Sequence, residues 1–308
     1  KFLKHHCMGK MMEIVFLGTG SMMPTKERAQ TAIYLSYWNE HMLFDCGEGT
    51  QRQLRIAGIS PAKINRIFLT HWHGDHFFGL PGLLENMSKH KMEKTIEIYG
   101  PKGTKLLVKK MADAFLLRYK IKINVHEINK NGVFLKDPRY IIRATYVKHG
   151  MPCIAYTFEE MPRRKIKTDY LKQKGIPEGP MLRQLQDGKD IIFRGRKITA
   201  REATYLQKGK KVAIILDTRI DKSCVNAAKN ADLLICEATF NRALQKKAKE
   251  FYHMTADDAG KLAKKAKVNT LVLTHFSQRY NSIQELEKEA KEHFKNVVMA
   301  RDFMKLNV

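Results

Sequence analysis

Residues 66–80 read RIFLTHWHGDHFFGL, and the rest of the sequence is interpreted outward from this stretch. Its first part, 66–69, is a short and mainly apolar run with the composition of a buried strand. Directly afterwards, three histidines and one aspartate fall within the six residues 71–76. So many metal-ligand side chains in one loop indicate a metal site. A chance histidine-rich loop and a single structural zinc site are the alternatives.

The order of these four side chains suits two neighbouring metal positions. In an extended chain the side chains alternate, so His71 and His73 point the same way. Gly74 allows a sharp turn, after which Asp75 and His76 can face a second position nearby. Neutral imidazole and carboxylate groups are suitable ligands for Zn²⁺. Two such sites that share a bridging carboxylate would form a hydrolytic two-metal centre.

Other apolar runs also lead into potential ligands or acids. Continuous apolar runs indicate strands that are buried on both faces. Polar groups at the carboxyl ends of such strands emerge together at one edge of the sheets. We therefore expect a convergent site, formed by the residues at or just beyond five runs: His71, His149, Asp217, Glu237 and His275.

The composition of the 308 residues is that of a globular chain, with 44% hydrophobic residues. No apolar run approaches the roughly 18–20 residues of a membrane span, so we expect no membrane association. Residues 1–12 are interpreted as an N-terminal extension and residues 13–308 as one domain. The five cysteines are scattered without a C-x-x-C pair, which favours a reducing, cytoplasmic location.

Strand and helix patterns alternate along most of the chain, which predicts an α/β sandwich. The expected strands are 13–18, 31–37, 41–47, 66–71, 95–100, 139–149, 153–159, 210–217, 231–239, 270–276 and a last one near 296–302. The expected helices are 49–58, 79–90, 103–117, 221–230, 255–267 and 283–294.

Residues 160–200 differ from this pattern because they are strongly basic and contain the turn-type cluster GIPEGP at 175–180. We interpret them as an inserted arm, since a connection of this length is usually functional or disordered. An ordinary long surface loop is the alternative. The whole chain carries 56 Lys and Arg against 31 acidic residues, a net charge of +25. This surplus favours a polyanionic partner such as nucleic acid, although a lysine-rich proteome would also produce it.

The motif H-x-H-x-D-H at 71–76 resembles that of the metallo-β-lactamase fold, a four-layer αββα sandwich with metals at one edge. Several further blocks resemble one family on that fold, the tRNA 3′-processing endoribonucleases called tRNase Z. These blocks are FLGTGSMMPTKERAQTAIYL (16–35), FDCGEGTQRQL (44–54), GLPGLL (79–84), CEATF (236–240), HMTADDAG (253–260) and THFSQRY (274–280). The resemblance spans about residues 13–302, and the arm is similar to the family's substrate-binding exosite arm. The length suits the short form, which implies a homodimer.

The resemblance implies two Zn²⁺ ions per subunit, with Mn²⁺ also compatible. One ion would be held by His71, His73, His149 and Asp217. The other would be held by Asp75, His76, Asp217 and His275. No phosphate-binding loop of the type G-x-x-x-x-G-K-[ST] is present, so we expect no nucleotide cofactor.

The resemblance also implies catalytic roles in phosphodiester hydrolysis. Asp75 would orient the attacking water as well as bind a metal. His253 would give a proton to the leaving 3′-oxygen, and Glu237 would orient His253 and keep it protonated. Cleavage of precursor tRNA would leave a tRNA 3′-hydroxyl and a trailer with a 5′-phosphate. The alternative for His253 is a role in capping the helix that begins near Thr255.

Basic and polar residues near the predicted cut and in the arm are candidates for RNA contacts. They are Lys26, Arg28, Ser277 and Arg279 near the site, and Arg163, Arg164, Lys165, Lys167, Lys172, Lys174, Arg183 and Lys189 in the arm. Three positions depart from the family pattern. Ala29 stands where asparagine is common, Cys236 replaces a histidine and Met254 replaces a serine.

Two other classes of function stay open. The first is another hydrolase on the same scaffold that acts on a small anionic substrate, such as a thioesterase of the glyoxalase II type, an arylsulfatase or a cyclic-nucleotide phosphodiesterase. The basic arm and the CEATF and HMT blocks argue against the thioesterase. The second is an RNA-binding protein without metals or catalysis, which the full ligand set argues against.

Overall fold

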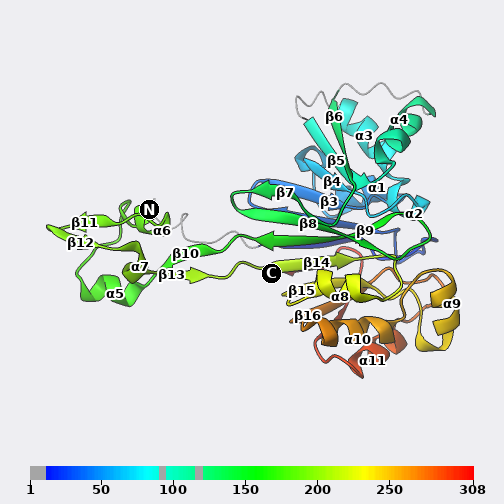
Figure 1. Ribbon diagram of the computed structural model, residues 1–308. Helices are drawn as coiled ribbons and strands as arrows, with labels where there is room; N and C mark the ends of the chain where they lie inside the picture. Colours follow the sequence, from blue (N-terminus) through cyan, green and yellow to red (C-terminus); the bar gives the residue numbers. More distant parts are fainter. Residues whose placement is uncertain (1–11, 90–94, 115–120) are drawn as a thin grey trace.

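The computed structural model describes residues 12–89, 95–114 and 121–308, and its body contains two seven-stranded sheets (Figure 1). The first sheet has the order β18–β1–β2–β3–β4–β5–β6. Its strands are β1 (Glu13–Gly18), β2 (Ala32–Tyr37), β3 (Glu40–Phe44), β4 (Arg66–Phe68), β5 (Thr95–Pro101), β6 (Lys122–Ile128) and β18 (Lys305–Asn307). Strands β3 to β6 run parallel to one another.

The second sheet has the order β17–β16–β15–β14–β9–β8–β7. Its strands are β7 (Gly132–Asp137), β8 (Tyr140–Val147), β9 (Cys153–Glu160), β14 (Lys211–Ile215), β15 (Leu233–Glu237), β16 (Thr270–Thr274) and β17 (Val297–Met299). Strands β14 to β17 are parallel, whereas β9 is antiparallel to both β8 and β14. Strand β8 therefore runs in the same direction as β14.

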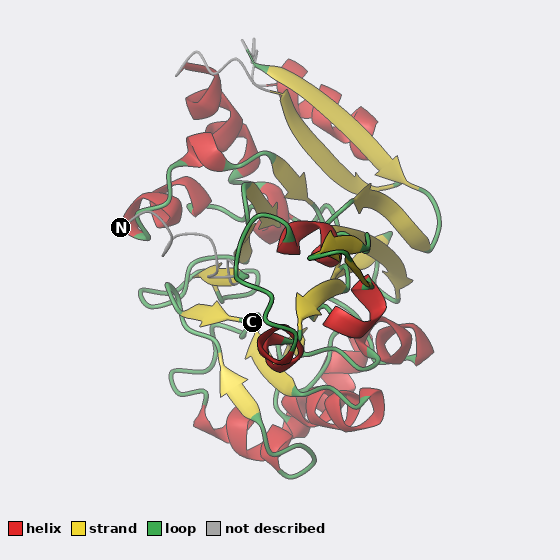
Figure 2. Ribbon diagram, turned by 90° about the vertical axis from the view of Figure 1, so that its left-hand side faces the viewer, coloured by secondary structure: helices red, strands yellow, loops and turns green. Residues whose placement is uncertain are grey.

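Helices cover the outer face of each sheet, which confirms the predicted αββα sandwich (Figures 1 and 2). The first sheet carries α1 (Thr50–Ile56), α3 (Leu80–Lys89) and α4 (Thr104–Ala114). The second carries α8 (Lys222–Ala228), α10 (Ala256–Ala266) and α11 (Gln284–Lys291). Among the residues that the structure describes, no helix is long and apolar enough to cross a membrane.

Alternation of side chains along the strands explains the layers. Ile14 and Phe16 of β1 belong to the core between the two sheets, whereas Val15 and Leu17 pack under the helices. All four side chains are fully buried, so residues 14–17 of this strand are apolar on both faces. Strands covered on both faces need such continuous apolar runs, and this is why those runs identified them in the sequence.

The observed elements differ from the expected ones mainly at their ends and at the edges of the sheets. Strand β4 ends at Phe68, three residues before His71, so the metal-motif segment begins as a loop. In the two large sheets, the expected strands do not include β6, β7 and β18, and no strand was expected within residues 160–207. Residues 90 and 115–117, the ends of two expected helices, lie outside the described residues. So does the expected extension at 1–12 apart from Met12, which is buried and whose carbonyl accepts a hydrogen bond from Val308.

Residues 163–207 project from the body as a separate lobe (Figure 1, left; Figure 2, facing the viewer). Its neck is the antiparallel pair β10 (Arg163–Ile166) and β13 (Thr204–Gln207). Beyond the neck lie α5 (Thr168–Gln173), α6 (Leu182–Gln186), β11 (Ile191–Phe193), β12 (Arg196–Ile198) and α7 (Ala200–Ala203). The lobe has its own apolar cluster, which includes Leu171 and Leu185. Because β13 completes the neck, the projecting segment reaches Gln207 and does not stop at residue 200.

Candidate metal centre

The seven predicted metal ligands lie together at one edge of the sandwich. His149, Asp217 and His275 follow the carboxyl ends of β8, β14 and β16, three strands of the second sheet that point the same way. The other four ligands come from the loop and short helix after β4 in the first sheet. The carboxyl ends of like-directed strands meet at one edge, so residues far apart in sequence converge there.

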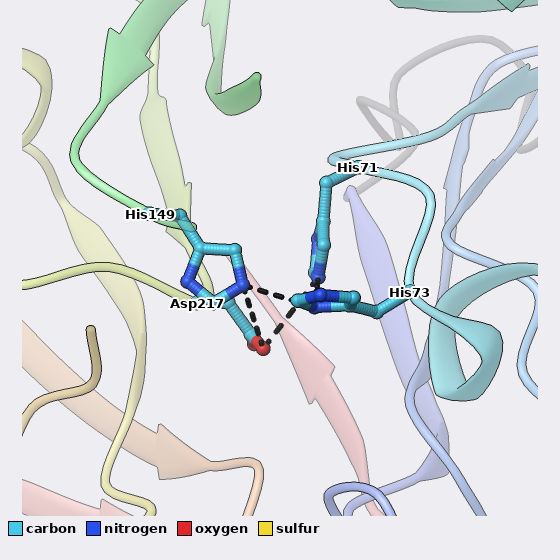
Figure 3. Close-up of side chains that lie close together, drawn as sticks. All are labelled: His71, His73, His149 and Asp217. Atoms are coloured by element: carbon cyan, nitrogen blue, oxygen red, sulfur yellow. Dashed lines mark hydrogen bonds and ion pairs between the residues drawn. The ribbon is translucent and has the colours of Figure 1, made fainter. Parts of the chain in front are cut away.

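His71, His73, His149 and Asp217 form the first of two groups (Figure 3). Nδ1 of His73 lies 3.0 Å from Nε2 of His71 and 3.0 Å from Nε2 of His149. Oδ2 of Asp217 lies 3.6 Å from Nε2 of His71 and 4.0 Å from Nε2 of His149. His71 and His73 point to the same place, as the alternation of an extended chain predicts.

Asp75, His76, Asp217 and His275 form the second group. Oδ1 of Asp217 lies 3.0 Å from Nε2 of His275 and 3.4 Å from Nε2 of His76. Oδ2 of Asp75 lies 3.3 Å from Nε2 of His76 and 3.5 Å from Nε2 of His275. Asp217 thus presents one oxygen to each group.

These spacings fit a divalent cation in each group. Ligand bonds of 2.0–2.2 Å in a tetrahedral arrangement place neighbouring ligand atoms about 3.4 Å apart. The measured separations of 3.0–4.0 Å scatter around that value. In the second group, Nε2 of His76, Nε2 of His275 and Oδ1 of Asp217 are buried without a hydrogen-bond partner. Such atoms are costly unless a ligand binds them.

In four of the histidines, Nδ1 has a protein partner. This leaves Nε2, the nitrogen that faces the site, free to bind a metal. Nδ1 of His76 lies 2.6 Å from Oδ2 of Asp45. Nδ1 of His71 lies 3.0 Å from the Thr70 hydroxyl, which itself donates to Asp45. Nδ1 of His275 lies 2.9 Å from the Thr239 hydroxyl, and Nδ1 of His149 lies 3.2 Å from the carbonyl of Tyr252.

The electrostatics of the centre favour a bound positive charge. Burial lowers the pKa of His71, His73 and His149, so these rings are neutral. Burial also disfavours a charged His76, but the carboxylates of Asp217, Asp45 and Asp75 outweigh it and raise the pKa of His76 well above its usual value. Burial would raise the pKa of Asp217, but His275, His76 and His253 hold it well below its usual value.

Asp45, which was not among the candidate residues of the sequence, supports two of these histidines, His76 directly and His71 through Thr70. Its carboxylate is fully buried and accepts hydrogen bonds from the Thr70 amide at 2.7 Å and from His76. Asp45 directly follows β3 and has a φ of 56°, an unusual conformation that is common at functional sites. The signal was present in the sequence, since Asp45 follows an apolar strand as Asp217 does, but it was counted inside the strand 41–47.

Beside this centre lie the two predicted proton-transfer residues. Nδ1 of His253 is 3.1 Å from Oε2 of Glu237, and Oδ2 of Asp217 is 3.9 Å from the same nitrogen. Glu237 is fully buried and also accepts hydrogen bonds from the Thr218 amide and the Thr239 hydroxyl. Burial opposes a charge on His253, but Glu237 and Asp217 raise the pKa of His253 to about 9.

The capping alternative for His253 does not match the geometry. The N-cap of α10 is Thr255, whose hydroxyl accepts from the Asp258 amide in a capping box.

Gly74 has a different role from the one expected. It begins the short helix α2 (Gly74–Phe77) and is not among the residues with positive φ. A Cβ atom at this position would lie 2.2 Å from the ring of Phe78. A larger residue at this position would therefore require the ring of Phe78 to move, and the first turn of α2 directs Asp75 and His76 into the second group.

The four candidate RNA contacts near the centre have different surroundings. Lys26 is exposed, whereas Arg28 is half-buried and donates to the carbonyl of Tyr280 at 2.6 Å. Ser277 is buried and its hydroxyl accepts from Arg279, whose guanidinium lies 5.0 Å from the centre of the Phe240 ring. Lys26 is thus open to solvent, and Arg28 also joins two loops beside the centre.

The eight arm cations lie on the projecting lobe, away from the metal centre. Cys153, at the start of β9, contacts the Asp217 carbonyl, whereas Glu160, at its other end, adjoins the neck. Eight residues of strand span roughly 25 Å. Lys167, Lys172, Lys174, Arg183 and Lys189 are exposed, and Arg163, Arg164 and Lys165 are half-buried in the neck. The hairpin β11–β12 adds exposed Arg194 and Arg196, which the sequence reasoning did not single out.

The three departures from the family pattern lie outside both groups. Cys236 and Met254 are fully buried in the apolar cluster between the second sheet and its helices. Their apolar surroundings suit these side chains. The backbone amide of Ala29 donates to Asp302 at 2.8 Å, a contact that does not depend on the side chain.

Sequence comparisons identify similar proteins along nearly the whole chain. A ribonuclease Z from Enterococcus faecalis is 40% identical over 299 residues, which cover 94% of this chain and 96% of that relative. A ribonuclease Z from Bacillus subtilis is 37% identical over 307 residues, which cover 96% and 99%. The family model described as Anti-Pycsar protein Apyc1 matches residues 12–116.

Solved structures are similar over the same extent. Human tRNase Z, short form, superimposes with a TM-score of 0.70 at 30% identity and covers 96% of this chain and 98% of its own. The metallo-β-lactamase fold protein YhfI from Bacillus subtilis has a TM-score of 0.71 at 20% identity, covers 96% and 99%, and supports the fold alone. The chain therefore belongs to the ribonuclease Z family, the tRNase Z endoribonucleases of the metallo-β-lactamase fold.

Proposed function

We propose that this endoribonuclease removes the 3′ trailer from precursor tRNA by two-metal phosphodiester hydrolysis. The observation that carries the proposal is the pair of ligand groups joined by Asp217, with three buried ligand atoms that have no protein partner. Family membership implies divalent metal binding. The histidine nitrogens in both groups favour zinc, and the carboxylates are also compatible with Mn²⁺.

One ion would be held by His71, His73, His149 and Asp217, and a second by Asp75, His76, Asp217 and His275. The chemistry that such a pair supplies is polarisation of the scissile phosphate and a lower pKa for an attacking water. Asp75 faces the second group and carries a carboxylate that stays ionised, because His76 and His275 lower its pKa against the effect of burial. It can therefore accept a hydrogen bond from the attacking water and orient it.

His253 would give a proton to the leaving 3′-oxygen. A pKa of about 9 keeps its ring protonated at neutral pH, and Glu237 holds Nδ1 so that Nε2 is the donating atom. The retained tRNA then ends in a 3′-hydroxyl, and the released trailer carries the 5′-phosphate. Since His253 lies beside Asp217, the proton donor and the reacting phosphate would occupy one site.

The basic lobe would bind the body of the RNA through its phosphates. Its cations lie beyond the end of β9 that is remote from the metal centre. They would therefore bind a part of the RNA that is distant from the cut. Lys26, Arg28, Ser277 and Arg279 would bind nearer the cut.

We also propose a homodimer in the cytoplasm. An apolar surface beside the metal centre surrounds a cavity of about 640 Å³, and its lining includes Trp72, Phe77, Phe78, Leu107 and Met111. Phe78 is 59% exposed and Leu107 is 37% exposed. Exposed apolar patches of this kind are typical of protein interfaces.

Cleavage of a 3′-extended precursor tRNA, with the cut mapped on both products, tests the proposal. Wild-type protein should cut at the trailer junction, and Asp75→Ala should lower kcat by at least about a hundredfold, because it removes a metal ligand and the group that orients the water. Wild-type activity in Asp75→Ala would refute the two-metal assignment. Hydrolysis of a small phosphodiester without any cut in the RNA would favour the alternative hydrolase.

A further inference from the structure

The helix that leads into His253 ends in an unusual cap. Helix α9 (Gln245–Glu250) is followed by Phe251 and then by Tyr252, which has a φ of 60°. The His253 amide donates to the Ala248 carbonyl at 2.7 Å, and the Tyr252 amide donates to the Lys249 carbonyl at 3.4 Å. This pair of hydrogen bonds is the Schellman motif, which normally has glycine at the position of Tyr252.

The cap directs two groups at the metal centre. The carbonyl of Tyr252 accepts a hydrogen bond from Nδ1 of His149 at 3.2 Å. The next residue is His253, the proposed proton donor. Tyr252, with its left-handed backbone, thus orients the ring of His149 and places His253, the proposed proton donor, beside the centre.

The ring of Tyr252 connects the cap to two further loops. The guanidinium of Arg219 lies 4.3 Å from the centre of this ring, a cation–π contact. The Arg219 amide donates to the Lys148 carbonyl at 2.9 Å. Lys148 directly precedes His149, and Arg219 follows Asp217 by two residues. The Arg219–Tyr252 contact therefore links the loops of His149, Asp217 and His253.

Glycine would adopt this backbone conformation at lower cost, because a side chain at positive φ is strained. We propose that Tyr252 and Arg219 are positioning residues, which act through each other to hold His149 and His253 at their distance from Asp217. This inference rests on the proposed function, since it concerns the metal group of His71, His73, His149 and Asp217.

The test separates positioning from folding. Tyr252→Gly keeps the carbonyl and relieves the strained backbone, but it loses the ring. We expect it to unfold at the same or a higher temperature than wild type. We also expect Zn²⁺ affinity of the first group and kcat on a small phosphodiester each to fall about tenfold, the lower end of measured effects of groups that orient ligands. The absorption spectrum of the Co²⁺-loaded protein should change, while Tyr252→Phe, which keeps the ring, should retain the wild-type spectrum.

Arg219→Ala and the double variant Tyr252→Gly/Arg219→Ala complete a double-mutant cycle. Because the two side chains act through one contact, the double variant should lose no more affinity than either single variant. Trp38→Gly is the matched control: Trp38 is also an exposed aromatic residue at positive φ, but it lies beside Tyr37, which contacts Glu160 at the far end of β9. It should leave metal affinity unchanged.

Additive losses would overturn the inference, because they would show that the two side chains act independently. Unchanged metal affinity with a higher KM for RNA alone would also overturn it, because it would assign Tyr252 to substrate binding. Failure of wild-type protein to bind two ions would instead refute the proposed function.

Discussion

At the metal centre, single residues with no direct contact to a metal decide how its ligands are oriented. Asp45 and Thr239 each engage Nδ1 of a histidine, so that Nε2 faces the site. Asp45 and His275 both have positive φ, as does Tyr252. Such conformations cost free energy, and they persist because the surrounding hydrogen bonds fix them.

Asp45→Asn should weaken binding of one Zn²⁺ ion by about ten- to a hundredfold. The amide removes a negative charge from beside His76, and rotation of its NH₂ group toward Nδ1 would disrupt the hydrogen bond. Competition titration against a chromophoric chelator measures the loss. Asp232→Asn is the control, because Asp232 binds the Lys211 amide at the opposite end of β14. Equal effects of the two substitutions would contradict this role of Asp45.

The pKa of about 9 for His253 predicts an alkaline limit on activity. The proton donor is the protonated ring, which predominates below that pKa, so kcat on RNA should fall as the pH rises through about 9. Glu237→Gln removes the main charge that raises the pKa of His253. The fall in kcat at alkaline pH should therefore begin at a lower pH in this variant. The measurement is single-turnover cleavage between pH 6 and about pH 10. Glu250→Gln is the reference variant. If kcat falls over the same pH range in both variants, Glu237 does not raise the pKa of His253.

Among the elements, strand direction places the metal centre and the lobe at opposite ends of the second sheet. Strands β8, β14, β15 and β16 all finish at the metal edge, whereas β9 runs the other way and leaves the body for the neck. The second sheet therefore lies between the centre and the neck, and the short connections 161–162 and 208–210 join the neck to β9 and β14.

Removal of the lobe should separate RNA binding from chemistry. Ile166 and Thr204 are paired across the neck, so residues 167–203 can be replaced by a two-residue glycine turn. The variant should show KM for precursor tRNA raised at least about tenfold, because phosphate contacts are lost. Its kcat/KM for a small phosphodiester should stay within about twofold of wild type, since the centre lies roughly 25 Å away along β9. A comparable loss on both substrates would contradict the separation.

For the whole molecule, the apolar surface near α2 and α4 predicts a dimer. Leu107→Asp places a charge at the edge of that surface and should shift the sedimentation coefficient from dimer to monomer at micromolar concentration. Ile192→Asp is the control, because Ile192 is 79% exposed on the hairpin of the lobe. The prediction fails if wild-type protein sediments as a monomer, or if both variants dissociate.

Continuous apolar strands and the histidine-rich loop were readable in the sequence because each follows a local rule. Buried strands such as β1 are apolar on both faces, and the motif at 71–76 is compact. The edge strand β6 has several partly exposed side chains, and β18 has only three residues, so neither has a clear periodicity. Their pairing with β5 and β1 makes them strands.

The sequence by itself therefore determined the α/β class, the histidine-rich loop and the basic segment, because strand burial, ligand chemistry and charge are properties of local stretches. The αββα layers and the full set of seven candidate ligands followed from the resemblance of its blocks to a known family. Only the tertiary structure decided which atoms face each other. The presentation of one Asp217 oxygen to each group, the contact of His73 Nδ1 with His149, the support of His76 by Asp45 and the hydrogen bond from His149 to the Tyr252 carbonyl all join residues distant in the chain. Their contacts depend on the directions of strands and on backbone conformations that the surrounding packing and hydrogen bonds stabilise.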